Sequence, residues 1–221
     1  MNFPTDKRMD FVVIVDVTEG NPNGDPMRNN TPRTDPYDGH GLITDVCIKR
    51  KVRDYMTDEG QEMLITREPV SINDLLCQVA KTCDPPDTKG KKDGGKKGKL
   101  GQAQGEVRAA AVCKRFIDAR LFGAMAETSD CPAGRIRGPL QLSMGRSLHP
   151  VRISKHQVTR IAVTDDKELE KPGTMSDEHG RQIIRYAAYR MMGTYSPRMG
   201  AKTGVSADDL EKFFTALQRC W

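Results

Sequence analysis

The sequence predicts an α+β fold because strand-like and helix-like segments alternate along the chain. Residues Met9 to Thr18 (MDFVVIVDVT) are rich in β-branched side chains, which is typical of a strand. Amphipathic helices with capping residues are expected after Thr44 and after Ser206. Alternating segments between these helices predict further strands. The resulting order, β–α–(insertions)–β–β–α, resembles a ferredoxin-like, or RRM-like, domain that lacks its last strand.

The predicted first strand has two unlike faces and leads into an unusual loop. Its odd-numbered positions from Phe11 to Val17 are all apolar, whereas the opposite face alternates Val12 and Ile14 with aspartates. From Glu19 to Gly41, proline and glycine recur so often that we expect neither a helix nor a central strand. Loops of this length in a compact domain are usually functional or disordered.

The segment after this loop predicts a helix with two distinct faces. We expect Thr44 to cap a helix that ends near Met56. At about 100° per residue, one arc of the helix is apolar and consists of Ile48, Val52, Tyr55 and Met56. A neighbouring arc is basic and consists of Lys49, Arg50 and Arg53. The sequence therefore predicts one core face and one basic stripe.

The middle of the chain is less regular. Residues 58 to 84 are weakly patterned, with a short helix expected at 71–80. The Pro85–Pro86 pair and the lysine–glycine tract up to Gly101 predict a flexible surface loop. A second long helix is expected from Glu106 to Met125, because Val112, Cys113, Phe116 and Ile117 stand at core spacing.

The last third of the chain predicts strands, a hairpin and a terminal helix. Strands are expected at 138–147, 158–164 and 183–196, and the polar segment 165–180 has the form of a projecting hairpin. Ser206 and Asp209 make an acidic variant of a capping box for the final helix. The expected buried stripe of that helix consists of Leu210, Phe213, Phe214, Leu217 and Trp221.

Charge is distributed unevenly along the 221 residues. The net charge is +5, but Lys89 to Lys99 contains six lysines and one aspartate and so accounts for all of it. The positions of individual basic residues therefore matter more than the overall charge. The most apolar stretch, Phe11 to Val17, is too short to cross a bilayer, and no apolar run follows the basic start. We expect a cytoplasmic protein with no membrane contact.

Cysteine and histidine residues give little sign of metal or nucleophile chemistry. The six cysteines form no Cys-x-x-Cys pair and no zinc-like grouping with histidine, so we expect reduced, buried thiols, with Cys47 and Cys113 inside helices. The four histidines are scattered, with no Ser–His–Asp order. Aspartates such as Asp25 are more often turn formers than metal ligands. We expect no catalytic residue, no metal and no cofactor.

The strongest local signal is the loop Asn21-Pro22-Asn23-Gly24-Asp25-Pro26, which lies between a strand and a capped helix. Folds of the α/β type often bind phosphates at this position, and Asn21, Asn23 and Gly24 can aim backbone N–H groups outward. The loop matches neither the Walker nor the Rossmann glycine spacing. The same composition is also that of an ordinary turn-rich connector. Both interpretations remain open.

Basic residues surround this loop in the sequence. These residues could converge on one polyanion, with arginine making bidentate phosphate contacts and lysine acting as a point charge. Such contacts position a nucleic-acid backbone and do not read its bases. The residues are Arg28, Arg33, Lys49, Arg50 and Arg53. A solvated helix face is the alternative for the helical ones. The loop lysines Lys91, Lys92, Lys96 and Lys97 either attract any nucleic acid or only keep a loop soluble.

Several stretches resemble the backbone subunit of type I-C CRISPR Cascade complexes, which belongs to the RAMP superfamily. They are NPNGDP after the first strand, PRTDPYDGHGLITDVCIKRKVRDYM up to Met56, and later GPLQLSMGRSLHPV and YRMMGTYSP. The resemblance covers most of the chain and is most specific before residue 57.

The resemblance implies an RRM-like palm with finger, web and thumb insertions. The palm would comprise residues 1–57 and 106–221, the finger and web residues 58–105, and the thumb residues 165–180. Such subunits form a filament along guide crRNA and present it for pairing with target DNA in antiviral defence. Their partners would be further copies of this chain, a large subunit, a small subunit and a crRNA-processing end subunit. The implied RNA contacts are Asn21, Asn23, Gly24, Arg28, Arg33, Lys49, Arg50, Arg53, Arg137 and Arg146.

Met175 lies among polar residues of the expected thumb. It is either an ordinary exposed apolar residue or a wedge that inserts into the base stack. The first strand lacks the stacked aromatic residues of an RRM, so RNA would be held by backbone shape and charge. Similar proteins usually continue beyond the final helix, so the resemblance implies a closing strand and a C-terminal tail that are either missing from this chain or not included in the sequence.

Two rival functions follow from the same residues. A metal-dependent RNA endonuclease would use an aspartate on a loop, and Asp25 is the best-placed one. A structural, protein-binding domain would contact no nucleic acid at all. Bound RNA in the purified protein distinguishes the guide-binding function from this last class.

Overall fold

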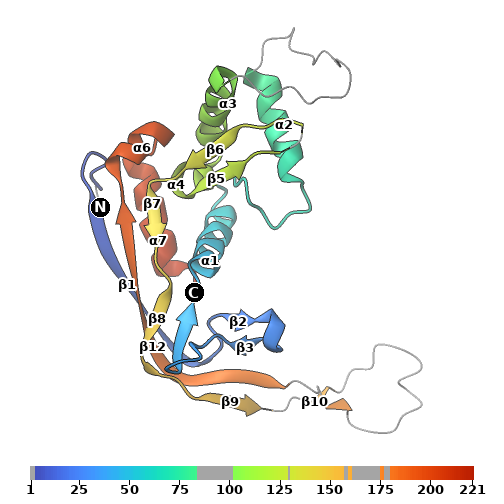
Figure 1. The fold of residues 1–221 in the computed structure, drawn as a ribbon, viewed down its shortest axis with the longest axis vertical. Coiled ribbons are helices and arrows are strands. Elements are labelled where there is room, and N and C mark those ends of the chain that lie inside the picture. Colours follow the sequence, from blue (N-terminus) through green and yellow to red (C-terminus); the bar gives the residue numbers. More distant parts are fainter. Residues whose placement is uncertain (1–2, 84–101, 129, 157–158, 161–174, 177–179) are drawn as a thin grey trace. The chain divides into compact units, whose positions relative to one another are not determined.

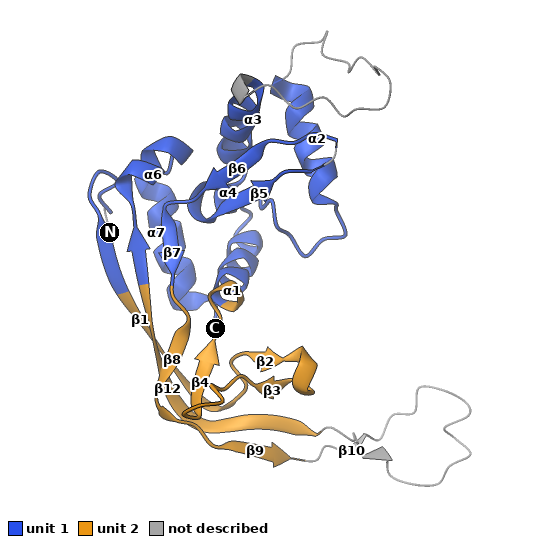
Figure 2. Cartoon of the chain, in the orientation of Figure 1, with its two compact units in different colours: residues 1–11, 48–142, 193–221 blue, residues 12–47, 143–192 orange. Residues whose placement is uncertain are grey.

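The computed structural model describes all residues except 1–2, 84–101, 129, 157–158, 161–174 and 177–179 (Figure 1). The chain forms two compact units (Figure 2). Unit 1 consists of residues 1–11, 48–142 and 193–221, and unit 2 consists of residues 12–47 and 143–192. The units are interleaved in the sequence, because strands β1 (Met9–Gly20) and β12 (Arg181–Tyr195) each contribute residues to both.

The principal sheet has six strands, and its main path follows the order β1, β12, β8 and β4. Strand β12 pairs antiparallel with β8 (Gly145–Pro150), with β7 (Leu140–Leu142) and with β9 (Ile153–His156). Strand β4 (His40–Ile43) pairs antiparallel with β8. Together with the helices, this antiparallel sheet confirms the α+β prediction.

Strand β1 shows the predicted two faces. Its side chains alternate between half-buried and exposed positions, and Val12 and Ile14 are 52% and 67% exposed. In unit 1 the ring of Phe11 packs against the backbone of β12 at Gly193, where a Cβ would come within 2.1 Å of it. Glycine at this position therefore makes room for the aromatic ring.

The core of unit 1 is formed by helices and a hairpin. Helices α2 (Ile72–Cys83) and α3 (Gln102–Arg115) pack with α4 (Ile117–Phe122) and with the antiparallel strands β5 (Gly123–Ala126) and β6 (Gly134–Arg137). Helix α2 confirms the short helix predicted at 71–80. Their shared apolar cluster contains Leu64, Leu76, Val79, Val112, Phe116, Ala119 and Ile136.

The long helix predicted from 106 to 125 is interrupted at Phe116 and ends at Phe122, so the prediction of one continuous helix is wrong. Phe116 has extended backbone angles, φ −103° and ψ 117°, and separates α3 from α4. The chain then enters β5 at Gly123, whose φ is 78° and where a Cβ would lie 2.4 Å from the Ile136 carbonyl oxygen. Apolar spacing continues across the break at Phe116, so periodicity alone did not reveal it.

Helix α1 (Asp45–Asp58) begins and packs as predicted. The Thr44 hydroxyl accepts a hydrogen bond from the Cys47 N–H at 3.3 Å, which confirms the cap. In unit 1, Ile48, Val52 and Met56 are buried, whereas Tyr55 is only half-buried.

The predicted loop from Glu19 to Gly41 contains more structure than expected. Strand β2 (Gly24–Asp25) pairs with β3 (Thr31–Pro32) across the 3-10 turn η1 (Pro26–Arg28). Strand β4 begins at His40, at the end of the sheet path. Its place depends on distant residues, since the Gly41 N–H donates to the Ser147 hydroxyl at 2.8 Å. The turn-forming residues of this segment therefore did not indicate the strand pairing that the structure shows.

The last helix, α7 (Ala207–Arg219), has the predicted capping box between Ser206 and Asp209. Leu210, Phe213 and Leu217 are buried as expected, and Phe214 is half-buried. The prediction that Trp221 is buried is wrong. Trp221 follows the helix end and is 47% exposed, with the Lys51 Nζ 4.6 Å from its ring centroid.

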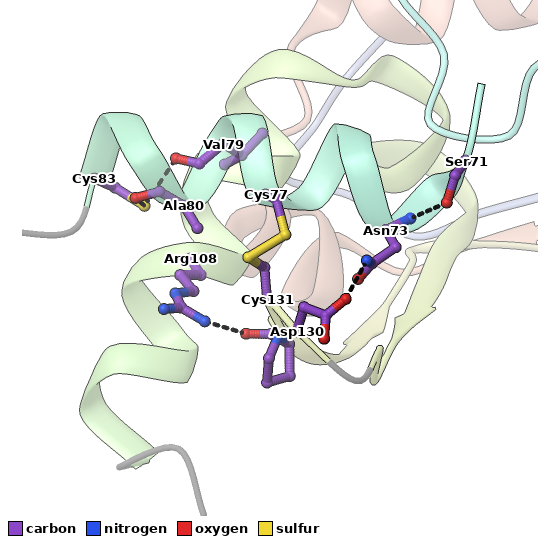
Figure 3. Close-up of a disulfide and its surroundings, with 10 residues drawn as sticks. Ser71, Asn73, Cys77, Val79, Ala80, Cys83, Arg108, Asp130 and Cys131 are labelled. Carbon is purple, nitrogen blue, oxygen red and sulfur yellow. Dashed lines mark hydrogen bonds between the residues drawn. A yellow bond between two sulfur atoms is a disulfide. The ribbon is translucent and has the colours of Figure 1, made fainter. Parts of the chain in front are cut away.

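The prediction of six reduced thiols is wrong for Cys77 and Cys131, which form a disulfide (Figure 3). The bond joins α2 to the segment between β5 and β6. Two further contacts hold this segment: the Asn73 amide donates to the Asp130 carboxylate at 2.6 Å, and Arg108 donates to the Pro132 carbonyl at 3.0 Å. The cysteines are 54 residues apart, so local spacing gave no sign of the pairing.

The remaining predicted elements are confirmed in part. Strands β7 and β8 cover the segment 138–147, with a break between them, and β12 covers 183–196. Strand β10 (Thr159–Arg160) pairs with β11 (Met175–Ser176). The rest of the expected hairpin and the lysine–glycine tract lie outside the described residues. Among the helices that are described, none combines the length and apolar character needed to cross a membrane.

The capping box of α7 leads to a pH-dependent stability. Burial acts to raise the pKa of Asp209, but hydrogen bonds from Arg120 and from the Ser206 N–H outweigh it and hold the pKa below its usual value. A depressed folded pKa contributes stability that is present above the ordinary aspartate pKa of about 3.9 and is lost as pH falls through the folded value. We expect Asp209→Asn to unfold with a weaker acid dependence than the parent in urea titrations across that range. An unchanged dependence would contradict this assignment.

Candidate nucleic-acid interface

The loop from Asn21 to Pro26 is a packed turn in unit 2. The Asn23 side-chain oxygen accepts from both the N–H and the hydroxyl of Thr44, each at 3.0 Å, and so ties the loop to the start of α1. The Asn21 amide donates to the Asn30 carbonyl at 2.6 Å. A Cβ at Gly24 would lie 1.9 Å from the Asn30 side-chain oxygen. These three residues shape the loop through contacts within the protein.

The Asp25 side chain is also held by contacts within the protein. Its carboxylate accepts from the Met27 N–H at 3.1 Å, which caps η1, and lies 3.5 Å from the Arg33 guanidinium. Among the described residues there is no group of three or more His, Cys, Asp or Glu that would hold a metal ion.

The arginines of unit 2 differ in how far they are neutralised. Arg28 is exposed and forms no ion pair with a described residue. Arg146 on β8 donates to Asp35 at 2.8 Å and also to Asp38. The hydrogen bond from Arg146 lowers the pKa of Asp35, and the same bond raises the pKa of Arg146. Much of the charge of Arg146 is thus already compensated by the loop before β4.

Sequence reasoning missed Arg190, which lies directly opposite Arg146 in the β8–β12 register. Arg190 is exposed, between the buried side chains of Tyr189 and Met191. The alternation of the predicted strand 183–196 places Arg190 on the outward face, but the sequence did not show that Arg146 lies opposite it in the sheet. The outward face of this part of the sheet therefore carries two adjacent arginines.

The basic stripe predicted on α1 is only partly a surface feature. Arg50 donates to Asp54 at 3.0 Å and Lys49 is half-buried. Arg53 is 8% exposed, which makes it the one buried residue of the predicted stripe. Its Nε donates to the buried Asp118 carboxylate at 2.8 Å. A guanidinium paired inside the core offers little surface to a phosphate, so this burial disfavours the RNA contact expected of Arg53, which stays a prediction.

The other predicted positions are spread over the chain. Arg137 is exposed on β6 together with Arg135, which the sequence analysis missed, and the buried Ile136 lies between them. Met175 lies on β11, opposite Arg160 of β10. The lysines Lys91, Lys92, Lys96 and Lys97 lie outside the described residues.

Burial shifts the pKa of two titratable groups in the core. Burial raises the pKa of the Cys113 thiol to about 11, which keeps it protonated at neutral pH. Burial also raises the pKa of Tyr189 to about 12. Both groups therefore behave as core residues.

The chain belongs to the Cas7 family of CRISPR-associated proteins, since residues 7–221 match the family described as CRISPR-associated protein Cas7. It is 26% identical over 232 aligned positions to a CRISPR-associated protein Cas7 of Haloferax volcanii. The alignment covers 97% of this chain and 63% of that protein, so this chain spans less than two thirds of the relative's length.

A solved structure shares the fold. A chain of a "CRISPR RNA-guided surveillance complex, pre-nicking" superimposes with a TM-score of 0.59 at 16% sequence identity. The match covers 96% of this chain and 71% of that chain. At this identity the likeness concerns the fold alone, and it agrees with the α+β arrangement described above.

Proposed function

We propose that this chain is a non-catalytic backbone subunit of a type I-C CRISPR surveillance complex. It binds guide crRNA, several copies line up along that RNA, and together they present it for pairing with target DNA. The observation that carries the proposal is the Cas7 family match over residues 7–221. The type I-C assignment rests on the resembling stretches of the first 56 residues, such as NPNGDP.

The parts of the subunit have distinct tasks in this proposal. The principal sheet and its helices form an RRM-like palm, residues 58–105 form the finger and web, and residues 165–180 form the thumb with Met175 as its wedge. The other partners are a large subunit, a small subunit and a crRNA-processing end subunit, in the cytoplasm. The antiparallel principal sheet and the fold likeness to a surveillance-complex chain support the palm assignment.

The guide is held by its backbone. The exposed face of β1 carries Val12 and Ile14 and no aromatic ring on which bases could stack. Arginines supply the binding energy instead, through contacts to phosphates that release counterions. In unit 2 the residues best suited to this are Arg28 and Arg190, because neither forms an ion pair with a described residue. Lys49 and Arg50 of α1, and Arg137, complete the proposed set.

Charge reversal in unit 2 tests this proposal. We expect Arg28→Glu combined with Arg190→Glu to reduce RNA affinity by about tenfold or more, since two attractive phosphate contacts become repulsive. The protein is co-expressed with a CRISPR array, and its RNA content is measured by absorbance ratio and sequencing. Arg198→Glu, an exposed arginine on α6 (Pro197–Thr203) in unit 1, is the matched control.

Two results would count against the proposal. A parent protein that purifies without guide RNA would exclude guide binding. Equal RNA content in the parent and in the double variant, with unchanged urea unfolding, would remove Arg28 and Arg190 from the interface.

A further inference from the structure

A cavity of about 240 Å³ lies in unit 2, between the β2–β3 hairpin and the strands beside it. One wall is apolar and consists of Pro32, Pro36, Leu42 and Met144. The lining also includes Arg28, Arg33 and three threonines. A cavity with an apolar wall and a few polar groups is the usual form of a small-ligand site.

The electrostatics of the cavity favour an anion. Its charged lining residues are Asp25, Arg28 and Arg33. Asp25 pairs with Arg33, so the cavity keeps a net charge of one positive unit, that of Arg28. In addition, the Arg33 Nε is buried and has no hydrogen-bond partner among the described residues. Because that atom is closed to solvent, a ligand contacts Arg33 through its other atoms, and the side chain as a whole is 33% exposed.

The apolar wall requires a second property of the ligand. Met144 is 48% exposed although it lines a cavity, and Pro36 is also exposed. A bound phosphate alone would leave the apolar side chains of this wall exposed to water, whereas a planar ring would cover them. The ligand therefore combines a negative group with a planar, partly apolar one.

We propose that this cavity holds one nucleotide of bound single-stranded RNA. The base lies against Leu42 and Met144, and its phosphate or a base oxygen accepts from Arg28 and Arg33. The proposal rests on the guide-binding function and adds to it a defined place for a single base. It makes the β2–β3 hairpin a clamp on one nucleotide in each subunit.

The test compares two methionines of equal exposure. Met144 lines the cavity and Met192 does not, yet both are 48% exposed, and the Met192 carbonyl accepts from the Ser143 N–H next to Met144. Nuclease-treated full-length protein is titrated with a labelled oligouridylate at several salt concentrations. We expect Met144→Ala to weaken binding about fivefold with an unchanged salt dependence, because it removes an apolar contact and no charge. Met192→Ala should bind as the parent does.

Arg28→Ala gives the complementary result. It should reduce the slope of log affinity against log salt by about 0.7, the value of one phosphate contact on a single strand. An oligomer of the same length with abasic sugars should bind the parent and Met144→Ala equally. This result would place the lost contact on the base.

The outcomes separate the two proposals. If oligouridylate binds but Met144→Ala equals the parent, the cavity holds no base and only this inference is overturned. The same holds if the abasic oligomer still distinguishes Met144→Ala from the parent. If no RNA binds the protein at all, the guide-binding function fails and this inference fails with it.

Discussion

Replacing Arg53 with alanine is expected to destabilise unit 1 by about 3–5 kcal/mol, the usual cost of breaking a buried ion pair. The Asp118 carboxylate is 1% exposed and accepts hydrogen bonds from Arg53 and from the N–H groups of Leu64 and Ile65. Without the guanidinium, a buried negative charge remains uncompensated. Urea unfolding followed by circular dichroism measures the change.

Arg50→Ala on the same helix is the control. Arg50 pairs with Asp54 near the surface, so its loss should cost no more than about 1 kcal/mol. If Arg53→Ala instead keeps the parent's stability and loses its RNA, Arg53 returns to the RNA-binding stripe that the sequence predicts.

Removing the disulfide is the second change with a large expected effect. Cys77→Ser should lower the free energy of unfolding by up to about 4 kcal/mol, because the bond closes a loop between residues 54 apart in the sequence. The native structure should persist, since the contacts of Asp130 and Pro132 to α2 and α3 remain. Unfolding with and without a reducing agent gives the measurement, and the reducing agent should leave Cys77→Ser unchanged.

Cys83→Ser controls for the loss of a thiol from the same helix. Cys83 is not part of the disulfide, and its thiol donates to the Val79 carbonyl at 3.2 Å within α2. We expect Cys83→Ser to respond to reduction as the parent does. Alkylation of Cys77 in the unreduced parent would contradict the disulfide itself.

Local signals predicted the elements that depend on local chemistry. The alternation of β1, the Thr44 cap and the Ser206–Asp209 capping box were all readable from neighbouring residues, and the structure confirms them. Local signals did not predict the elements that depend on partners distant in the sequence. The hairpin β5–β6 and the strand β4 need hydrogen-bonding groups supplied by other segments, such as the Ser147 hydroxyl for the Gly41 N–H.

The candidate site shows the same division. Residue types in the Asn21–Pro26 loop indicated a special turn, but only the structure shows that Asn23 holds Thr44. Helical periodicity placed Arg53 beside Lys49 and Arg50, yet it gave no information about Asp118, which lies 65 residues further along the chain. Arg190 was missed for the same reason, because its neighbour Arg146 across the sheet is distant in the sequence.

The interleaving of the two units has a consequence for synthesis on the ribosome. Unit 2 needs residues 143–192 and unit 1 needs residues 193–221, including the buried Leu210 and Phe213. Neither unit can close while residues 1–142 are emerging, so β1 waits without its partner β12 until residues 181–195 have been translated. Pairing between segments so far apart is slow, and an unpaired strand with Val12 and Ile14 exposed invites association with other nascent chains. The aspartates Asp10 and Asp16, on the same face, act as charged gatekeepers during this interval.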